Sequence, residues 1–262
     1  MQNTFERYDF AGDGAANLRS RLRAEHAELF QFAERCVSIV LDVTALLPLA
    51  SASRQIVVSQ FFARAASHFQ AGLMLSECGM AIESLTLSRS LFETCFVMLA
   101  IAENAVLPDE LLSHDNAVRL KHANALLNSK DYPNVEPYRE ALDAFVQRVS
   151  GVKEIGFREF ARRGKALATY DGLYRHLSHH ALHATLSAVD DYLTTDAEGK
   201  HYVHYRPLLE KTPAAVLTAC AGILLACFAC EKAWVCTPDT SETLARAWTE
   251  YESLYEKHRP WS

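Results

Sequence analysis

The chain has 262 residues, of which 50% are hydrophobic and 22% charged, which is enough apolar material to build one folded domain. This composition excludes intrinsic disorder and collagen-like repeats. Lysine and arginine number 26 against 32 aspartates and glutamates, so the formal net charge is -6. Proteins that bind nucleic acid over a broad surface are usually basic, so a nucleic-acid site here has to be a local patch.

Hydrophobic periodicity predicts a succession of helices and almost no strand. In chain order the expected helices are Asn17–Leu47, Ser53–Ser76, Met80–Asn104, Pro108–Asn128, Glu136–Val149, Phe157–Ala168, Asp171–Leu193, Pro213–Val235 and Ser241–His258. A loop with two prolines is expected at Lys130–Pro137 and a small hairpin at Asp196–Pro207. We therefore predict an all-α, mostly antiparallel multi-helix bundle that forms a single domain over residues 1–262.

One stretch is long and apolar enough to be weighed as a membrane span. Thr212–Cys230 has no charged residue, but it is rich in Ala, Cys and Thr, and Lys211 and Glu231 bound it directly. A buried core helix fits this composition better than a bilayer. The seven cysteines are an odd number, and the N-terminus does not resemble a secretion signal. We expect a cytoplasmic protein with reduced thiols and no membrane association.

The helix expected at about residues 80–102 is apolar on nearly every side, which is typical of a central, buried helix. Arg89 and Glu93 lie about 40° apart around this helix, on the same stripe as Ile82 and Phe96. Their spacing allows an ion pair within the helix. Two interpretations stay open, because inward charges occur both as structural pairs and at sites of chemistry.

A second unusual segment, Tyr174–His183, holds four of the 11 histidines of the chain. Its polar side chains are Tyr174, Arg175, His176, Ser178, His179, His180 and His183. On one helix three of these histidines share a face, whereas the tyrosine and the serine share another line. This density indicates either a solvated polar face or a functional site.

Together the two segments resemble a bacterial family known as domain of unknown function 5677. The resemblance rests on Arg89-x-x-x-Glu93 and on a downstream Tyr-Arg-x-Leu-Ser motif followed by His-Ala-x-His, and it spans about residues 55–195. Ala184 stands where the family pattern has proline. The resemblance implies an α-helical fold and no activity. We expect the N-terminal helix and the two C-terminal helices to pack on this core. The resemblance also implies one cluster of side chains, formed by Arg89, Glu93, Tyr174, Arg175, Ser178, His180 and His183.

A further resemblance concerns function. Arg175-His176, three residues and then His180 read as Arg-polar-x-x-x-His, which is similar to the ribonuclease motif of the HEPN (higher eukaryotes and prokaryotes nucleotide-binding) superfamily. Those proteins are helical bundles, commonly dimeric, that cut RNA without metal in toxin and antiphage systems. The resemblance implies a homo-oligomeric, metal-independent endoribonuclease. A neutral imidazole can deprotonate a ribose 2′-hydroxyl, and an arginine can stabilise charge on the phosphate.

The candidate residues follow from both resemblances. The catalytic candidates are Arg175, His180, His183, Glu93, Arg89 and Tyr174, and the ligand-binding candidates are Ser178, His176 and His179. RNA is the expected partner, because residues 153–175 carry six cationic side chains against three anionic ones inside an acidic protein. On an unbroken α-helix, however, Arg175 and His180 would point about 140° apart. They would then meet only across a helix break or a dimer interface.

Two other classes of function stay open. The first is a non-catalytic binding or scaffold protein in which the same polar cluster is structural. The second is a metal-dependent enzyme, because His176 and His180, like His179 and His183, have the spacing that lets two imidazoles grip one ion. The HExxH and paired Glu-x-x-His signatures are absent from the sequence, so we expect no bound metal or cofactor.

Overall fold

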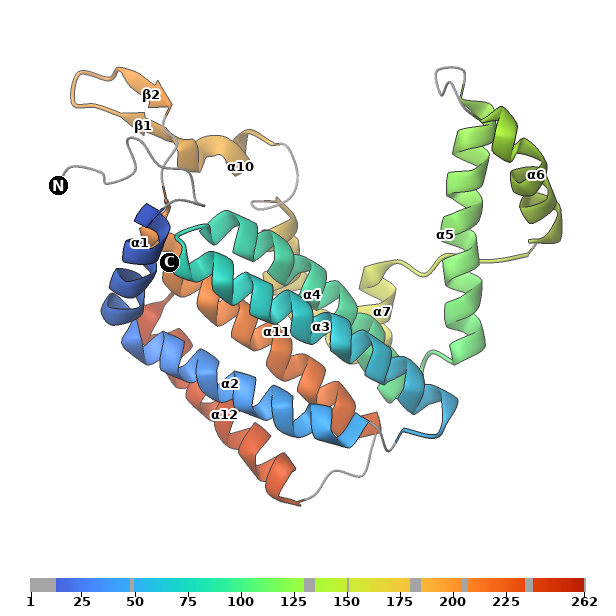
Figure 1. Cartoon of the computed structure of the whole chain (residues 1–262), viewed down its shortest axis with the longest axis horizontal. Coiled ribbons are helices and arrows are strands. Elements are labelled where there is room, and N and C mark those ends of the chain that lie inside the picture. Colours follow the sequence, from blue (N-terminus) through green and yellow to red (C-terminus); the bar gives the residue numbers. More distant parts are fainter. Residues whose placement is uncertain are drawn as a thin grey trace.

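The computed structural model describes residues 13–47, 50–129, 135–149, 151–179, 185–203, 207–233 and 238–261. Within these residues the chain forms the predicted all-α, mostly antiparallel bundle, with one small two-stranded sheet. Its long helices run side by side in Figure 1. They are α2 (Ala27–Leu46), α3 (Ser53–Glu77), α4 (Ala81–Ala102), α11 (Thr212–Ala233) and α12 (Pro238–His258).

Helix α4 is the central helix that its composition predicts. Helices α3 and α11 pack along it, and α7 (Phe157–Arg163) contacts it as well. Every residue from Thr94 to Ala102 is buried, because a helix with no polar face has to be enclosed on all sides. The uncharged stretch Thr212–Cys230 of α11 is mostly buried as well, as expected of a core helix.

Two helical stretches, Ala81–Ala102 and Leu209–Ala233, are long and apolar enough to cross a membrane by length and composition alone. Most of each apolar window is buried inside the bundle, at 72% and 83% respectively. Core helices of a bundle show the same combination of length, hydropathy and burial.

The N-terminal helix departs from the prediction. The expected helix Asn17–Leu47 is broken at His26, which has non-helical dihedral angles and separates α1 (Asp13–Glu25) from α2. Before the break, Arg19 and Arg23 of α1 form ion pairs with the buried carboxylate of Glu77 at the end of α3. The prediction of one continuous helix was wrong, because the apolar period of the sequence continues through the break. The buried carboxylate of Glu77 requires cationic partners, and α1 supplies them.

The segment Asp171–Leu193, which was expected to form one helix, differs from the prediction even more. The described part begins with a π-helical turn, Tyr170–Tyr174, followed by α9 (Arg175–Leu177), and Ser178 and His179 are again π-helical. Downstream lie α10 (Leu186–Val189) and a 3-10 turn, Asp190–Tyr192. An unbroken helix would place Leu186, Val189 and Leu193 on one apolar stripe, but all three are exposed, Leu186 to 84%.

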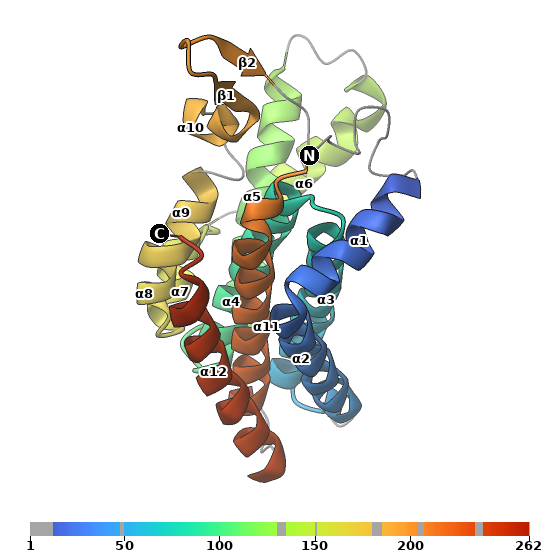
Figure 2. The ribbon, with the colours of Figure 1, turned by 90° about the vertical axis from the view of Figure 1, so that its left-hand side faces the viewer.

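The expected helix Phe157–Ala168 is also divided. Helix α7 ends at Arg163, and the chain turns through Gly164 and Lys165 into the short α8 (Leu167–Thr169). A Cβ atom on Gly164 would lie 2.8 Å from Cβ of Leu99 and 2.9 Å from the backbone nitrogen of Ala100. The end of α7 therefore packs against the backbone of α4, and Figure 2 shows α7, α8 and α9 along the side of the bundle next to α12.

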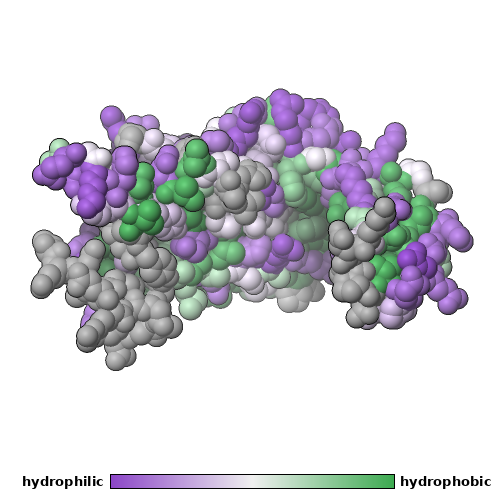
Figure 3. Space-filling model, turned by 90° about the horizontal axis from the view of Figure 1, so that it is seen from above, coloured by the Kyte–Doolittle hydropathy of each residue, from purple (hydrophilic) through white to green (hydrophobic). Residues whose placement is uncertain are grey.

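Helices α5 (Pro108–Asn128) and α6 (Arg139–Arg148) stand apart from the long helices, and we call them the arm (Figure 1). A 3-10 turn, Glu136–Tyr138, leads into α6, and the predicted loop Lys130–Pro137 lies mostly outside the described residues. The predicted hairpin is present, but its strands are β1 (Leu193–Thr195) and β2 (His201–Val203), so it starts earlier than expected. Figure 3 shows apolar side chains on the surface at the arm end and at the hairpin end.

Candidate functional site

A closed polar network joins α4 to the segment that carries the histidines. Arg89 donates from Nε to Ser178 Oγ at 2.9 Å and from Nη2 to the Tyr174 hydroxyl at 2.9 Å. Its Nη1 lies 3.0 Å from Oε1 of Glu93, and the Tyr174 hydroxyl donates to the same Oε1 at 2.8 Å. The predicted contact between the charges of α4 and this segment is therefore present.

Water reaches this network only in part. The side chains of Arg89 and Glu93 are 15% and 18% exposed, so both charges are largely shielded from water. Tyr174 is buried, with its ring stacked on Tyr170 at 4.8 Å and edge-on to Phe96 at 5.6 Å. Burial and the hydrogen bond to Glu93 raise the pKa of Tyr174 to about 12. Its hydroxyl therefore stays protonated near neutral pH and acts as a donor rather than as a base.

The π-helical turn Tyr170–Tyr174 holds the network tyrosine. In a π turn the backbone hydrogen bond joins residues five apart, and such turns are frequent at functional sites. Gly172 lies within this turn, and a Cβ atom there would meet no atom within 4 Å. The sequence gives no signal for a π turn, because its apolar period does not differ enough from that of an α-helix.

The other candidate residues of this segment do not join the network. Arg175 is 67% exposed, and its guanidinium lies 3.8 Å from Asp171, a long and weak ion pair. The imidazole of His176 contacts the ring of Trp261 edge-on, with centroids 4.6 Å apart. His179 is exposed, and its carbonyl accepts a hydrogen bond from the Thr185 hydroxyl at 3.2 Å.

His180 and His183 lie outside the described residues. Of the seven side chains expected to form one cluster, the structure thus brings together Arg89, Glu93, Tyr174 and Ser178. Arg175 lies on a different line of the helix and faces solvent.

Fewer cations of the basic stretch 153–175 are available to bind an anion than its composition suggests. Arg162 and Arg163 both bond to Glu159, and their hydrogen bonds lower the pKa of this carboxylate to about 2. Lys165 is paired with Glu103 at 2.6 Å. The remaining cations of the stretch are Lys153, Arg158 and Arg175. The positive charge left for a phosphate is therefore concentrated around Asp171, which lies 4.0 Å from Arg158 and close to Arg175.

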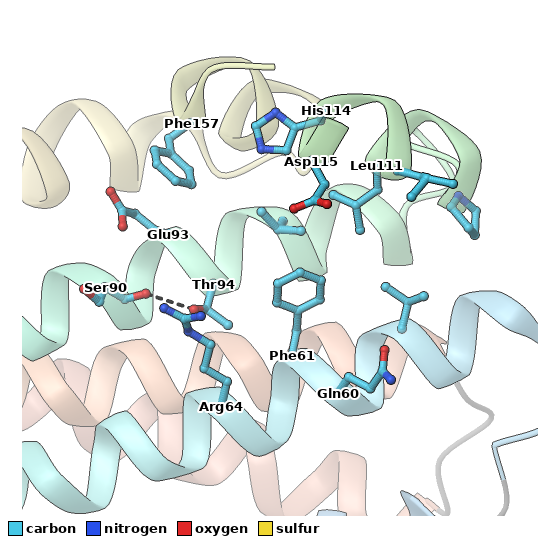
Figure 4. A pocket seen from close by; sticks show the side chains of 14 residues that line it. Gln60, Phe61, Arg64, Ser90, Glu93, Thr94, Leu111, His114, Asp115 and Phe157 are labelled. Atoms are coloured by element: carbon cyan, nitrogen blue, oxygen red, sulfur yellow. Dashed lines mark hydrogen bonds between the residues drawn. The ribbon is translucent and has the colours of Figure 1, made fainter. Parts of the chain in front are cut away.

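A first pocket, of about 480 Å³, lies between α3, α4 and α5, and we call it the arm-side pocket. Figure 4 shows Glu93 and Arg64 on its walls, with His114 and Asp115 contributed by α5. Nδ1 of His114 accepts a hydrogen bond from the backbone of Ile155 at 3.0 Å, and burial lowers the pKa of this imidazole, which favours the neutral form. Of these wall residues, sequence reasoning had found only Glu93.

A second pocket, of about 510 Å³, lies between the π-helical segment and α12, and we call it the aromatic pocket. His176 lines it together with Trp248, Tyr251, Tyr255 and Trp261. These four aromatic residues stand more than 70 positions downstream of the histidine, so no local motif connects them in the sequence.

No group of three or more His, Cys, Asp or Glu side chains that could hold a metal ion occurs among the described residues. The two histidine pairs with metal-binding spacing each include His180 or His183, which are not among those residues. Cys227 and Cys230 are buried on α11, as expected of core thiols.

Residues 55–201 match the model of a family of unknown function, DUF5677. The match covers more than half of the chain, so the protein belongs to this family. It includes both the Arg89–Glu93 pair of α4 and the Tyr174–Ser178 pair, and hence the whole polar network. No curated protein and no solved structure gives a significant match to the chain.

Proposed function

We propose that the chain is a HEPN-like, metal-independent endoribonuclease that acts on single-stranded RNA as a toxin or antiphage effector. The observation that carries the proposal is the exposed Arg175 in the segment that forms one wall of the aromatic pocket. Arg175 directly precedes His176, which lines this pocket, and its guanidinium is exposed and only weakly paired. An exposed cation thus directly precedes, in the chain, a residue that lines the aromatic pocket.

This combination suits an unpaired RNA strand. Proteins bind single-stranded nucleic acids by stacking bases on aromatic side chains while cations contact the phosphates. Here Trp248, Tyr255 and Trp261 supply the rings. Arg158 supplies a second exposed cation near Arg175, since both flank Asp171 at about 4 Å. Surface ion pairs of this kind contribute little stability, so a phosphate can replace the carboxylate.

In the proposed reaction, His180 removes the proton of a ribose 2′-hydroxyl, and the 2′-oxygen attacks the adjacent phosphorus. The bond from phosphorus to the 5′-oxygen breaks, and His183 returns a proton to this leaving group. Arg175 stabilises the negative charge that develops on the phosphate. The π-helical geometry at Ser178 and His179 supports this arrangement, because π turns bring residues five apart close together, whereas an α-helix separates them.

The Arg89 network has a positioning role in this proposal. The hydrogen bonds from Arg89 to Tyr174 and Ser178 hold the segment on either side of Arg175 and His176. Because Glu93 is held by both Arg89 and Tyr174, the network orients the segment and does not itself contact RNA.

The test is cleavage of a single-stranded oligoribonucleotide by the purified protein, alongside growth of cells after induced expression. We expect cleavage with a chelator present, toxicity on expression, and a loss of both in Arg175→Ala and His180→Ala by about 100-fold or more. Arg139→Ala is the matched control, because this arginine is exposed and paired on the arm. Unchanged cleavage in the two variants, or none by the wild-type protein, contradicts the proposal.

The main rival is a non-catalytic binding or scaffold protein in which the network is structural. The neutral, buried Tyr174 hydroxyl favours this function for the network itself. It predicts no toxicity and a loss of soluble protein in network variants. A His/Glu metal enzyme predicts instead a stoichiometric ion in the purified protein that His183→Ala removes, which elemental analysis measures.

The proposal includes a homo-oligomer, because the ribonucleases with a similar motif are commonly dimeric. Helix α6 has no fully buried residue within the described chain, and its apolar residues Leu142, Phe145 and Val146 stay partly exposed, which leaves a surface that a second copy could cover. Sedimentation velocity at micromolar concentration tests this, and a purely monomeric protein contradicts it.

A further inference from the structure

We infer that the arm-side pocket is a binding site for a small amphipathic carboxylate, independent of the proposed RNA site. The first observation is an arginine without a partner. Arg64 reaches from α3 toward the stretch of α4 between Ser90 and Thr94 (Figure 4). Among the residues that the structure describes, no carboxylate lies within ion-pair distance of Arg64.

A second donor stands beside this arginine. Gln60 lies one helical turn before Arg64 on α3, so both side chains line the same wall of the pocket. The Gln60 amide has no hydrogen-bond partner within the described part of the chain. A guanidinium and an amide NH₂ together present several donors to one incoming anion.

The acidic residues of the pocket do not neutralise Arg64, because each has a cation of its own. Glu93 accepts from Arg89 and Tyr174 through the same carboxylate oxygen. Asp115 lies 3.6 Å from Arg119, one turn along α5. The pocket therefore contains one uncompensated positive charge, and the matching ligand group is a single negative charge.

The remaining walls of the pocket are apolar, so the rest of the ligand should be apolar too. Phe61, Val97, Leu111 and Phe157 line the pocket beyond the polar wall. A volume of about 480 Å³ falls in the range of small-molecule sites. A compact aliphatic or aromatic body carrying one anionic head satisfies both parts of the surface.

A carboxylate fits better than a phosphate monoester. A phosphate would bring a second negative charge for which the pocket offers no second unpaired cation, whereas one charge is balanced by Arg64. A planar carboxylate also matches the fork geometry of a guanidinium, which allows two parallel hydrogen bonds.

Calorimetric titration of the purified full chain tests the inference with octanoate, with octanol as its uncharged analogue and with octyl phosphate as its dianionic one. We expect octanoate to bind at least about tenfold more tightly than either analogue. Arg64→Gln removes the charge from an exposed position and is expected to abolish the preference over octanol. Leu112→Trp narrows the pocket from its rim, where Leu112 is 59% exposed, and is expected to weaken both ligands.

The matched control is Arg139→Gln, which removes an exposed arginine outside the pocket and leaves binding unchanged. Failure of octanoate to bind, equal binding of octanol, or wild-type preference in Arg64→Gln each overturns the inference. Tighter binding of octyl phosphate overturns the choice of a carboxylate. None of these measurements uses RNA or Arg175, so their outcome is separate from that of the ribonuclease test.

Discussion

Replacing Glu93 by alanine tests whether the network holds the histidine segment on the bundle. The substitution removes the anionic partner of Arg89 and the acceptor of the Tyr174 hydroxyl at once. Breaking a fully buried ion pair costs about 3–5 kcal/mol, and breaking an exposed pair about 0–1 kcal/mol. The pair here is 15% and 18% exposed, and Arg89 keeps its bond to Ser178. We therefore expect the free energy of unfolding to fall by about 2 kcal/mol.

Urea unfolding followed by far-ultraviolet circular dichroism measures this change. Glu93→Gln is the conservative variant, because its amide oxygen still accepts from Tyr174 while the charge is lost, and we expect a fall of about 1 kcal/mol. Glu242→Ala is the matched surface control, since Glu242 and Arg246 form an exposed pair one turn apart. It is expected to stay within about 0.5 kcal/mol of the wild-type protein.

A double-mutant cycle with Arg89→Ala and Glu93→Ala isolates the pair itself. Residues in one hydrogen-bond network show coupling energies of about 0.5–3 kcal/mol, and we expect at least about 1 kcal/mol. A loss in Glu93→Ala no larger than that of the surface control would refute the reasoning. The network would then be a solvated contact that positions nothing.

Three further outcomes follow from the structure. Gly164→Ala is expected to destabilise by about 1–3 kcal/mol in urea unfolding, because the new Cβ meets the backbone of α4, whereas Gly172→Ala, which meets nothing, is expected to be neutral or stabilising. Tyr174→Phe removes the donor to Glu93 and is expected to lower the free energy of unfolding by about 1–2 kcal/mol in the same assay. Burial lowers the pKa of His114 below its ordinary value of 6.5, so its stabilising contribution is complete above that pH and is lost as pH falls through the lowered pKa. His114→Asn is therefore expected to reduce the loss of stability between about pH 7 and about pH 5, and an unchanged pH dependence contradicts this.

The helices most accessible to sequence reasoning are those whose ends carry local signals. Helix α5 begins at Pro108 and ends at Asn128 as predicted, because proline at the first helical position is a strong start signal. The residues of the polar network could also be predicted from the sequence. The two members of each pair, Arg89 with Glu93 and Tyr174 with Ser178, stand four residues apart. The side chains of each pair therefore lie on the same face of a helix.

Other features depend on contacts that no local pattern records. The ion pairs that join α1 to Glu77 connect residues that are remote in the sequence. The exposed position of Leu186 shows that an apolar stripe predicts burial only where another element covers it. Arg64 lies on the exposed side of an ordinary helix in the sequence pattern. Its role in a pocket becomes visible only in the structure, where α5 completes the arm-side pocket that Arg64 lines.

The segment that follows the π turn presents two lines of side chains with separate tasks. Tyr174 and Ser178 form the inner line, which Arg89 binds, whereas Arg175 lies on an outer, solvent-exposed line. Substitutions on the two lines should therefore separate stability from the proposed RNA binding. Ser178→Ala is expected to lower the free energy of unfolding by about 1 kcal/mol. Arg175→Ala is expected to leave it within about 0.5 kcal/mol while weakening binding of a single-stranded oligoribonucleotide, because an exposed arginine with one long ion pair contributes little to folding. Equal effects of both variants on unfolding would show that the two lines act as one structural unit, and the assignment of Arg175 to RNA would lose its basis.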